Sequence, residues 1–302
     1  MYFPAAFPCF RHGYHARMAS DETCASSASP GYSKRRIERV RDGTSECVDD
    51  CVAEEVPVAM LYNGRSFAVM MATPRDLDDF ALGFSLSEGL IRTADQLTGI
   101  DVHPRLEGIE LSMTVDREAP AAFLDRRQER LLPGRGSCGI CGTREMEDAI
   151  RQPQRISDAA RFSSRALELA LAELQHHQPM NAATGAVHAA AWADTEGRIL
   201  LSREDIGRHN ALDKLIGAMQ RAGHRPDVGM LLLTSRASYE MVTKATSVGI
   251  GFIAAISAPT ALAIELARSA NVCLIGFARP GGYNVYNSPV HLETPRTNPA
   301  CP

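Results

Sequence analysis

Apolar and polar positions along the chain form two different patterns, and the first covers residues 55–124. Val56–Tyr62 and Arg65–Ala72 predict two strands, and the Asn63-Gly64 pair between them predicts a tight hairpin. Two further strands are predicted at 99–103 and 108–115. With one helix among them, these strands favour a small α+β domain.

The helix of this first region is predicted from its ends as well as from its period. Thr73 is expected to cap its amino end, Pro74 suits the first helical position, and Gly89 is expected to end the helix. Its apolar face consists of Leu77, Phe80, Ala81 and Phe84. We therefore expect the helix to cover one face of the predicted strands.

The second pattern consists of continuous apolar runs, which are typical of strands buried on both faces. The runs are Val228–Ser235, Ile250–Ser257 and Val272–Ala278, and helical periods separate them at 238–248 and 260–270. Before them, the sequence predicts a helix at Ala166–Gln175, a hairpin of Val187–Ala193 with Arg198–Ser202, and a helix at Gly207–Arg221. The alternation of strands and helices predicts an α/β fold of three layers with a largely parallel sheet and right-handed crossovers.

These patterns divide the chain into four parts. Residues 1–45 are rich in Ser, Ala, Arg and Gly without an apolar period, so they are expected to be a disordered tail. Residues 46–124 form the small α+β domain, and 125–150 are a charged, glycine-punctuated segment expected to be a flexible linker. Residues 151–302 form the α/β domain, which is expected to bind a cofactor.

Composition and charge narrow the class of protein. The apolar content of 45% and charged content of 23% are ordinary for a soluble globular protein, and the net charge of -4 argues against nucleic acid as a partner. Val248–Ala267 is as apolar as a membrane span, but Ser257, Pro259 and Glu265 suit a strand, a turn and a helix start, so no membrane segment is expected. Eight cysteines without a secretory signal favour a reducing cytoplasm.

Polar residues follow three of the predicted strands. The carboxyl ends of parallel strands meet at one edge of a sheet, where ligands of such sheets bind. The segments at this edge are Thr234–Ser238, Ser257–Thr260 and Arg279–Gly282. Their hydroxyls, glycines and arginines, together with two helix starts, predict a pocket for a phosphorylated ligand. The alternative is that Ser238 and Thr260 only cap their helices.

Chemistry is most evident in Gly134–Gly142, where four glycines surround Cys138 and Cys141. Glycine lets the backbone bend freely, so this loop suits the presentation of a thiol to a large partner. The attacking species of a cysteine is its thiolate, and Arg135 and Arg144 are expected to lower the thiol pKa.

Three kinds of site use such a Cys-x-x-Cys pair. A structural zinc site needs two more ligands, for which Cys47 and Cys51 are the candidates, although they lie outside the predicted ordered core. A thioredoxin-like pair needs a strand and a helix around it, which a glycine-rich linker does not provide. A sulfur carrier needs one thiolate that accepts a persulfide sulfur and a second thiol that releases it by forming a disulfide.

Two histidines are further candidates, and both are expected to have structural roles. His209 follows Asp205, a predicted helix cap, and lies three residues before Leu212 at the edge of the predicted core. His188 falls on the same strand face as Trp192. Packing is therefore the favoured interpretation for each of them.

Several segments, in order along the chain, resemble the motifs of one known family. They are residues 54–58, 136–142, 184–191, 203–214, 235–242 and 257–260. Together they are similar to the formate dehydrogenase accessory sulfurtransferases over about residues 50 to 292.

The resemblance implies a sulfur carrier with Cys138 and Cys141 as catalytic residues and no intrinsic metal. Cys138 would take sulfur from a cysteine desulfurase as a persulfide. It would pass this sulfur to the bis-molybdopterin guanine dinucleotide form of the molybdenum cofactor, the cargo, before that cofactor enters formate dehydrogenase. The resemblance also implies a cytoplasmic homodimer and a cytidine-deaminase-like C-terminal domain. The implied cofactor-binding residues are Ala278, Arg279, Pro280, Gly281, Gly282 and Tyr283.

Two rival functions make different demands on the sequence. A zinc-dependent deaminase needs a His-x-Glu followed by Pro-Cys-x-x-Cys, whereas here the cysteine pair precedes His188 and residue 190 is alanine. A chaperone that shelters the molybdenum cofactor without chemistry would need neither Cys138 nor Cys141.

Overall fold

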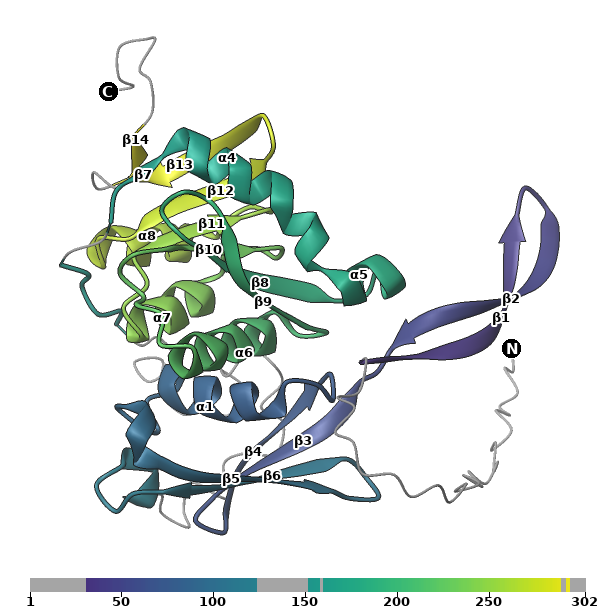
Figure 1. Cartoon of the computed structure of the whole chain (residues 1–302), viewed down its shortest axis with the longest axis horizontal. Coiled ribbons are helices and arrows are strands. Elements are labelled where there is room, and N and C mark those ends of the chain that lie inside the picture. The colour runs from purple at the N-terminus through teal and green to yellow at the C-terminus, as the bar shows by residue number, and fades with distance from the viewer. Residues whose placement is uncertain (1–30, 124–151, 158–159, 289–291, 294–302) are drawn as a thin grey trace, which may run out of the picture.

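The computed structural model describes residues 31–123, 152–157, 160–288 and 292–293. Cys138 and Cys141 lie outside the described residues. The chain folds as two domains that pack together, with a two-stranded arm beside them (Figure 1). Among the described residues, no helix is long and apolar enough to cross a membrane.

The N-terminal domain is a four-stranded sheet with one helix on it. Strands β3 (Val56–Tyr62) and β4 (Arg65–Ala72) form the predicted hairpin, and the sheet order is β4-β3-β6-β5. Strands β5 (Leu97–Pro104) and β6 (Ile109–Val115) pair antiparallel, while β3 and β6 pair parallel. Helix α1 (Leu77–Ser87) packs between this sheet and the second domain. The predicted α+β domain is confirmed.

The amino end of α1 differs from the prediction. Thr73 is not the cap, because the helix begins four residues later, after Asp76 in the left-handed conformation at φ 53°. The backbone N–H of Thr73 instead donates a hydrogen bond to Asp205 Oδ2 at 3.0 Å, so a contact with the other domain overrides the local preference. The carboxyl end was predicted correctly, since Gly89 follows the helix at φ 68°.

The arm corrects the prediction that residues 1–45 are disordered throughout. Strands β1 (Tyr32–Arg41) and β2 (Thr44–Ala53) pair antiparallel over their whole length and project from the body of the molecule (Figure 1). Asp42 and Gly43 turn the chain with φ values of 50° and 77°. Such a positive-φ Asp-Gly pair suits the right-handed twist of a hairpin, and this local preference outweighs the polar composition of the segment.

A six-stranded mixed sheet forms the centre of the C-terminal domain, in the order β13-β12-β11-β10-β8-β9. Its strands are β8 (His188–Ala193), β9 (Ile199–Asp205), β10 (Met230–Leu233), β11 (Phe252–Ala255), β12 (Cys273–Arg279) and β13 (Gly282–Asn287). The predicted parallel arrangement holds for β10, β11 and β12. The other neighbours, β13 with β12, β10 with β8, and β8 with β9, pair antiparallel.

Helices cover both faces of this sheet and make three layers (Figure 1). Helix α4 (Ser164–Glu173) packs on one face, against alternate strand residues such as Leu232. The other face, which carries Leu231 and Leu233, packs against α6 (Arg208–Arg221), α7 (Tyr239–Ser247) and α8 (Ala261–Ser269). The remaining short elements are η1 (Ala94–Gln96), η2 (Pro120–Phe123), β7 (Phe162–Ser163), η3 (Leu174–His177), α5 (Pro179–Thr184) and β14 (Leu292–Glu293).

Helices α1 and α6 join the two domains at close range. A Cβ atom added to Gly83 would lie 1.7 Å from the carbonyl oxygen of Asp213, and one added to Gly217 would lie 1.9 Å from that of Asp79. The two backbones therefore approach each other where neither helix has a side chain. The hydrophobic core is continuous across this contact, from the N-terminal sheet to the strands of the C-terminal sheet.

Candidate functional site

The three loops predicted to form a ligand edge lie side by side. The N–H of Ile256 donates to the carbonyl of Leu233 at 2.8 Å, and that of Thr260 donates to Ala237 at 3.1 Å. On the other side, the N–H of Phe277 donates to the carbonyl of Ser257 at 3.2 Å. The ends of β10, β11 and β12 thus form one continuous edge, which we call the carboxyl edge.

The segment implied to bind the cofactor is the hairpin between β12 and β13. Arg279 pairs with Gly282, and the turn between them places Pro280 before Gly281, whose φ is 89°. Proline followed by a positive-φ glycine fits a type II turn. Arg279 is exposed, and its Nη1 donates to the carbonyl of Ile256 at 2.9 Å. The guanidinium therefore lies against the carboxyl edge.

The other two residues of this segment face the protein. Ala278 is fully buried, whereas Tyr283 is half-buried and packs on the α4 side of the sheet. Burial, reinforced by the nearby Glu168, raises the pKa of Tyr283, so its hydroxyl stays protonated near neutral pH. Exposed backbone and the Arg279 guanidinium are therefore what this hairpin offers a ligand.

A second group of polar side chains gathers where α6 and α7 begin. His209 Nε2 lies 2.7 Å from Glu240 Oε2, Ser238 Oγ donates to the same oxygen at 3.4 Å, and Arg208 Nη2 lies 3.8 Å from it. With His188, these four residues are called the edge cluster. Glu240 was not predicted from the sequence. The signal that could have identified it is its place as an acidic residue in the first turn of a helix that starts at the carboxyl edge.

His188 opens β8 beside this cluster. The N–H of Ala189 donates to Thr234 Oγ1 at 2.8 Å, which ties the start of β8 to the end of β10. Burial lowers the pKa of His188, and the positive charge of Arg208 lowers it further. His209 is 2% exposed, which agrees with its expected place at the edge of the core, whereas His188 is only half-buried.

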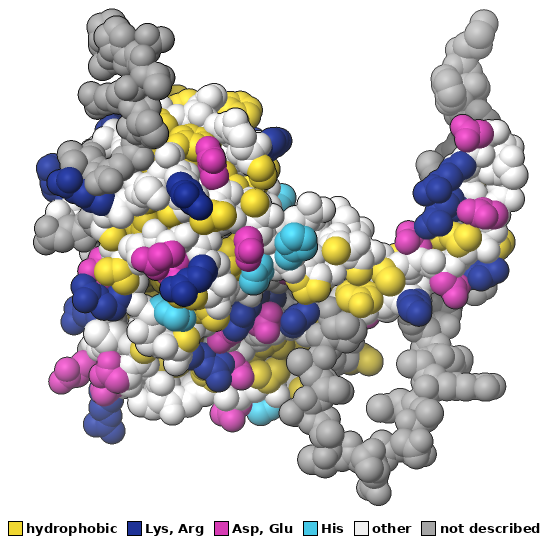
Figure 2. Space-filling model, turned by 45° about the horizontal axis from the view of Figure 1, so that its top comes forward, with side chains coloured by type: hydrophobic (Ala, Val, Ile, Leu, Met, Phe, Trp, Pro, Cys, Tyr) yellow, Lys and Arg dark blue, Asp and Glu magenta, His cyan; other side chains and the backbone are white. Residues whose placement is uncertain are grey.

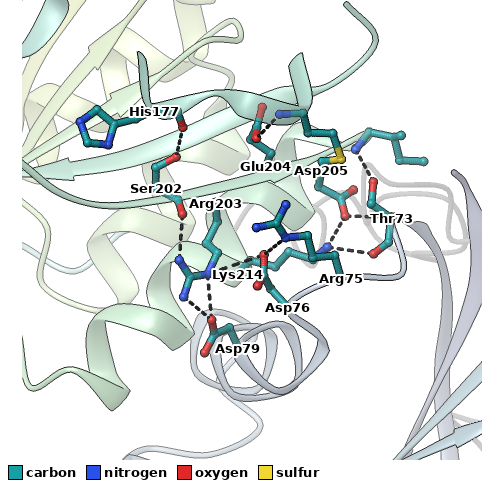
Figure 3. A network of polar contacts seen from close by, with 12 residues as sticks. Thr73, Arg75, Asp76, Asp79, His177, Ser202, Arg203, Glu204, Asp205 and Lys214 are labelled. Atoms are coloured by element: carbon teal, nitrogen blue, oxygen red, sulfur yellow. Dashed lines mark hydrogen bonds and ion pairs between the residues drawn. The ribbon is translucent and has the colours of Figure 1, made fainter. Parts of the chain in front are cut away.

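Next to the edge cluster, a buried network joins the two domains (Figure 3). Asp205 Oδ2 accepts from Lys214 Nζ at 2.7 Å and from the N–H of Thr73 at 3.0 Å. Its other oxygen accepts from the N–H of Gly207 and from Asn210 Nδ2 at 2.8 and 2.9 Å. Asp205 is not the helix cap that was predicted, because Gly207 occupies that position without a side-chain cap.

A second buried lysine repeats this arrangement further along α6. Lys244 Nζ lies 3.0 Å from both carboxylate oxygens of Asp213, and it also donates to Ser87 Oγ and Glu88 Oε1. Burial alone lowers the pKa of Lys244, but the carboxylates of Asp213 and Glu88 outweigh it and raise that pKa. The two lysines with their partners, Thr73, Asp205, Ser87, Glu88 and Asp213, are called the interdomain cluster.

A pocket of about 310 Å³ opens at the rim of the interdomain cluster. Arg203 lies there with its Nη2 2.7 Å from Asp79 Oδ2, while Ser202 Oγ donates to the backbone carbonyl of His177 (Figure 3). The pocket is lined by Arg75, Asp76, His176, His177, Pro179, Ser202, Arg203 and Glu204. Its cations and carboxylates are largely paired with each other.

Both described ends of the segment that holds Cys138 and Cys141 lie near the end of α1. The N–H of Ala121 donates to the carbonyl of Leu90 at 2.9 Å. Residues 152–154, where the description of the chain resumes, line a cavity of about 1020 Å³ together with Ile91. The described chain therefore stops and resumes at this junction of the two domains.

The described cysteines differ in their surroundings. Cys47 is exposed and Cys51 is half-buried on the arm, while Cys273 is buried in β12, where burial raises its pKa to about 12. Within the described ranges, no group of three or more His, Cys, Asp or Glu side chains is placed to hold a metal ion. Charged side chains of both signs are interspersed over the face seen in Figure 2.

These features define a class: a two-domain α/β protein whose cysteine-bearing segment connects a small α+β domain to a mixed sheet with an arginine-bearing carboxyl edge. The model of the FdhD/NarQ family matches residues 53–293. The chain belongs to the FdhD/NarQ family.

Individual relatives agree with this assignment. The chain is 52% identical to a sulfur carrier protein FdhD from Xanthomonas euvesicatoria over 267 residues, which is 88% of this chain and 94% of the relative. It is 47% identical to the protein of that name from Cupriavidus necator over 264 residues, 87% of this chain and 91% of the relative. A solved structure from Desulfotalea psychrophila, assigned as a formate dehydrogenase accessory protein, matches with a TM-score of 0.68 and 25% identity, covering 87% of this chain and 100% of that one.

Proposed function

We propose that this chain is a sulfurtransferase that carries sulfur as a persulfide on Cys138. Its donor is a cysteine desulfurase, and its acceptor is the bis-molybdopterin guanine dinucleotide form of the molybdenum cofactor, which formate dehydrogenase requires. The observation that carries the proposal is the near-complete match, at 47–52% identity, to relatives named sulfur carrier proteins. The Cys138-x-x-Cys141 pair supplies the chemistry that such a role needs.

Sulfur transfer on this pair is balanced without a metal or an external oxidant. The Cys138 thiolate attacks the outer sulfur of the donor persulfide, a new S–S bond forms, and the donor cysteine leaves as its thiolate. Cys141 then attacks the Sγ of Cys138, which gives a Cys138–Cys141 disulfide and releases the carried sulfur at the oxidation level of sulfide. A thiol reductant of the cell returns the disulfide to two thiols.

The carboxyl edge is the proposed binding site of the molybdenum cofactor. Arg279 and the exposed backbone of Pro280, Gly281 and Gly282 suit a guanine nucleotide arm, because an arginine contacts phosphate through charge-assisted hydrogen bonds.

A guanine nucleotide tests the proposed binding site. GDP is expected to bind the wild-type chain, and Arg279→Ala should weaken binding by about 1.5–3 kcal/mol, as measured by isothermal titration calorimetry. Arg268→Ala is the matched control, since it removes another exposed arginine, in the last turn of α8. Unchanged affinity in Arg279→Ala would move the nucleotide away from this hairpin.

The proposed setting is the cytoplasm, and the proposed assembly is a homodimer.

The function is tested in cells whose own copy of the gene has been deleted, by assaying formate dehydrogenase after complementation. Cys138→Ala should give no activity at normal protein abundance, whereas Cys47→Ala, on the exposed arm, should restore wild-type activity. Full activity with Cys138→Ala would replace the carrier by a chaperone that shelters the cofactor without chemistry.

A further inference from the structure

The edge cluster has no part in the proposed sulfur transfer, although three side chains converge on one oxygen there. Glu240 Oε2 is contacted by His209 at 2.7 Å, by Ser238 at 3.4 Å and by Arg208 at 3.8 Å. A carboxylate only accepts hydrogen bonds, so Nε2 of His209 must carry a hydrogen and be the donor of this hydrogen bond. Glu240 therefore fixes the orientation of His209 and forms a longer ion pair with Arg208.

Two nitrogen atoms of the cluster lack partners. Arg208 Nε and His209 Nδ1 are buried and have no hydrogen-bond partner among the residues that the structure describes, and the same holds for the acceptor Oδ1 of Asn210 on the next residue. The side chain of His209 is 3% exposed. Because buried polar groups nearly always have a partner, two such atoms on consecutive residues indicate a ligand that completes them.

The charges around these atoms favour an anion. Arg208 is always positively charged, and His188 and His209 become so on protonation. Within the described part of the chain, the carboxylate of Glu240 contacts both Arg208 and His209. The carboxylate of the nearby Asp205 is engaged elsewhere, because both of its oxygens accept hydrogen bonds from other donors. The cluster therefore offers more hydrogen-bond donors than its one carboxylate accepts from, and protonation of His188 would add positive charge to that of Arg208.

The helix starts add further donors on the same side. Gly207 caps α6 and has no side chain, while Ser238 caps α7 with its Oγ bonded to the Glu240 carboxylate and not to a backbone N–H of the helix. The first N–H groups of a helix have no partner within the helix, and their positive end attracts anions. Two uncapped helix starts therefore reinforce the side chains of the edge cluster.

We propose that the edge cluster is an oxyanion-binding subsite. Arg208 binds a tetrahedral oxyanion through its guanidinium, and His188 is a further donor. The imidazolium form of His209 donates from Nδ1, and Glu240 is a positioning residue. The inference rests on the proposed function, because the cargo supplies the anion. The edge cluster lies beside β8, and the Arg279 hairpin lies beside β12. Three strand spacings, or about 14 Å, separate the two strands. The cluster and the hairpin would therefore contact different groups of one extended ligand.

Two oxyanions of such a cargo share this chemistry: a phosphate of a nucleotide arm, and the oxo group of the metal. Inorganic phosphate and molybdate are therefore titrated separately into the full chain by isothermal titration calorimetry. At least one should bind saturably, and Arg208→Met should weaken it roughly ten-fold or more, because a charge-assisted contact is lost. His188→Gln should weaken it about three-fold. Arg268→Met is the control and should bind as the wild type does.

Each outcome decides the inference. Binding of phosphate alone, dependent on Arg208, supports a nucleotide phosphate, and binding of molybdate alone supports the metal group. Failure of both anions to bind the wild type overturns the subsite, as does wild-type affinity in Arg208→Met. If Arg208→Met does not fold, the half-buried His188 decides in its place. Loading of sulfur on Cys138 is measured on the same wild-type protein, so its absence beside Arg208-dependent binding would contradict the proposed function alone.

Discussion

Two polar clusters border α6, and they differ in how completely their hydrogen bonds are satisfied. In the interdomain cluster, both oxygens of Asp205 accept two bonds each, and Lys244 reaches Asp213, Ser87 and Glu88. In the edge cluster, buried nitrogens of Arg208 and His209 are without partners in the described chain, as is Oδ1 of the adjoining Asn210, whose amide nitrogen bonds Asp205. A satisfied buried network holds two domains together, whereas an incomplete one is suited to a ligand.

The largest predicted effect breaks the satisfied cluster. Lys214→Met keeps the length of the side chain but leaves the carboxylate of Asp205 buried without its cation. The free energy of unfolding should fall by about 3–5 kcal/mol, as measured by urea denaturation.

The control for this variant removes an exposed ion pair. Arg198→Met breaks the contact with Asp194, in which Arg198 is 74% exposed, and should not change the denaturation midpoint measurably. Equal midpoints for Lys214→Met and Arg198→Met would mean that the buried pair does not hold the domains together.

The second prediction separates the domains at their closest approach. Gly83→Ala places a Cβ 1.7 Å from the Asp213 carbonyl, so α1 and α6 must move apart and the unfolding free energy should drop by about 1–3 kcal/mol. Gly99→Ala is the matched control, because its Cβ would lie at an ordinary 3.5 Å from Thr114. Similar thermal midpoints in the two variants would contradict the close contact.

The third prediction tests the incomplete cluster through pH, with sulfate as a probe that does not itself titrate. The pKa of His188 is lowered by burial and then by Arg208, while Asp205 and His209 also face it. A bound anion favours the protonated ring and raises that pKa. The affinity for sulfate should therefore increase a few-fold as the pH falls from 8 to 6. A His188→Gln protein with the same pH profile as the wild type would assign the effect to another group.

The smallest effect concerns a thiol in the satisfied interior. Cys273 has its pKa raised to about 12 by burial, so only about one thiol in ten thousand is ionised at pH 8. Iodoacetamide should leave Cys273 unmodified while it alkylates the exposed Cys47, as read by peptide mass spectrometry. Alkylation of both at the same rate would show that β12 opens readily.

The elements of the fold were predictable where local pattern and packing agree. The bounds of β3 and β4 match the predicted runs, and the buried strands β10 to β12 were recognisable from their continuous apolar residues. The arm was not predicted because its strands are mostly exposed and carry no apolar period. The Asp42-Gly43 turn is the one feature of the sequence that indicates a hairpin there.

The candidate site was predictable in part. The adjacency of the loops at the carboxyl edge followed from the parallel order of the strands. Thr73 and Asp205 were misassigned as helix caps because their true partners lie in the other domain, 132 positions apart in the sequence. The contact of His209 with Glu240 could not be predicted from the sequence either, because it joins two helices that are brought together only by the sheet.

The central claim, that Cys138 carries sulfur, is tested most directly by peptide mass spectrometry after incubation with a cysteine desulfurase and cysteine. We expect an addition of about 32 Da, one sulfur atom, on the peptide that contains Cys138. Cys141→Ala should still acquire this mass but release it slowly, because the resolving thiol is absent. Sulfur found on Cys47 or Cys273 with Cys138 unmodified would contradict the account.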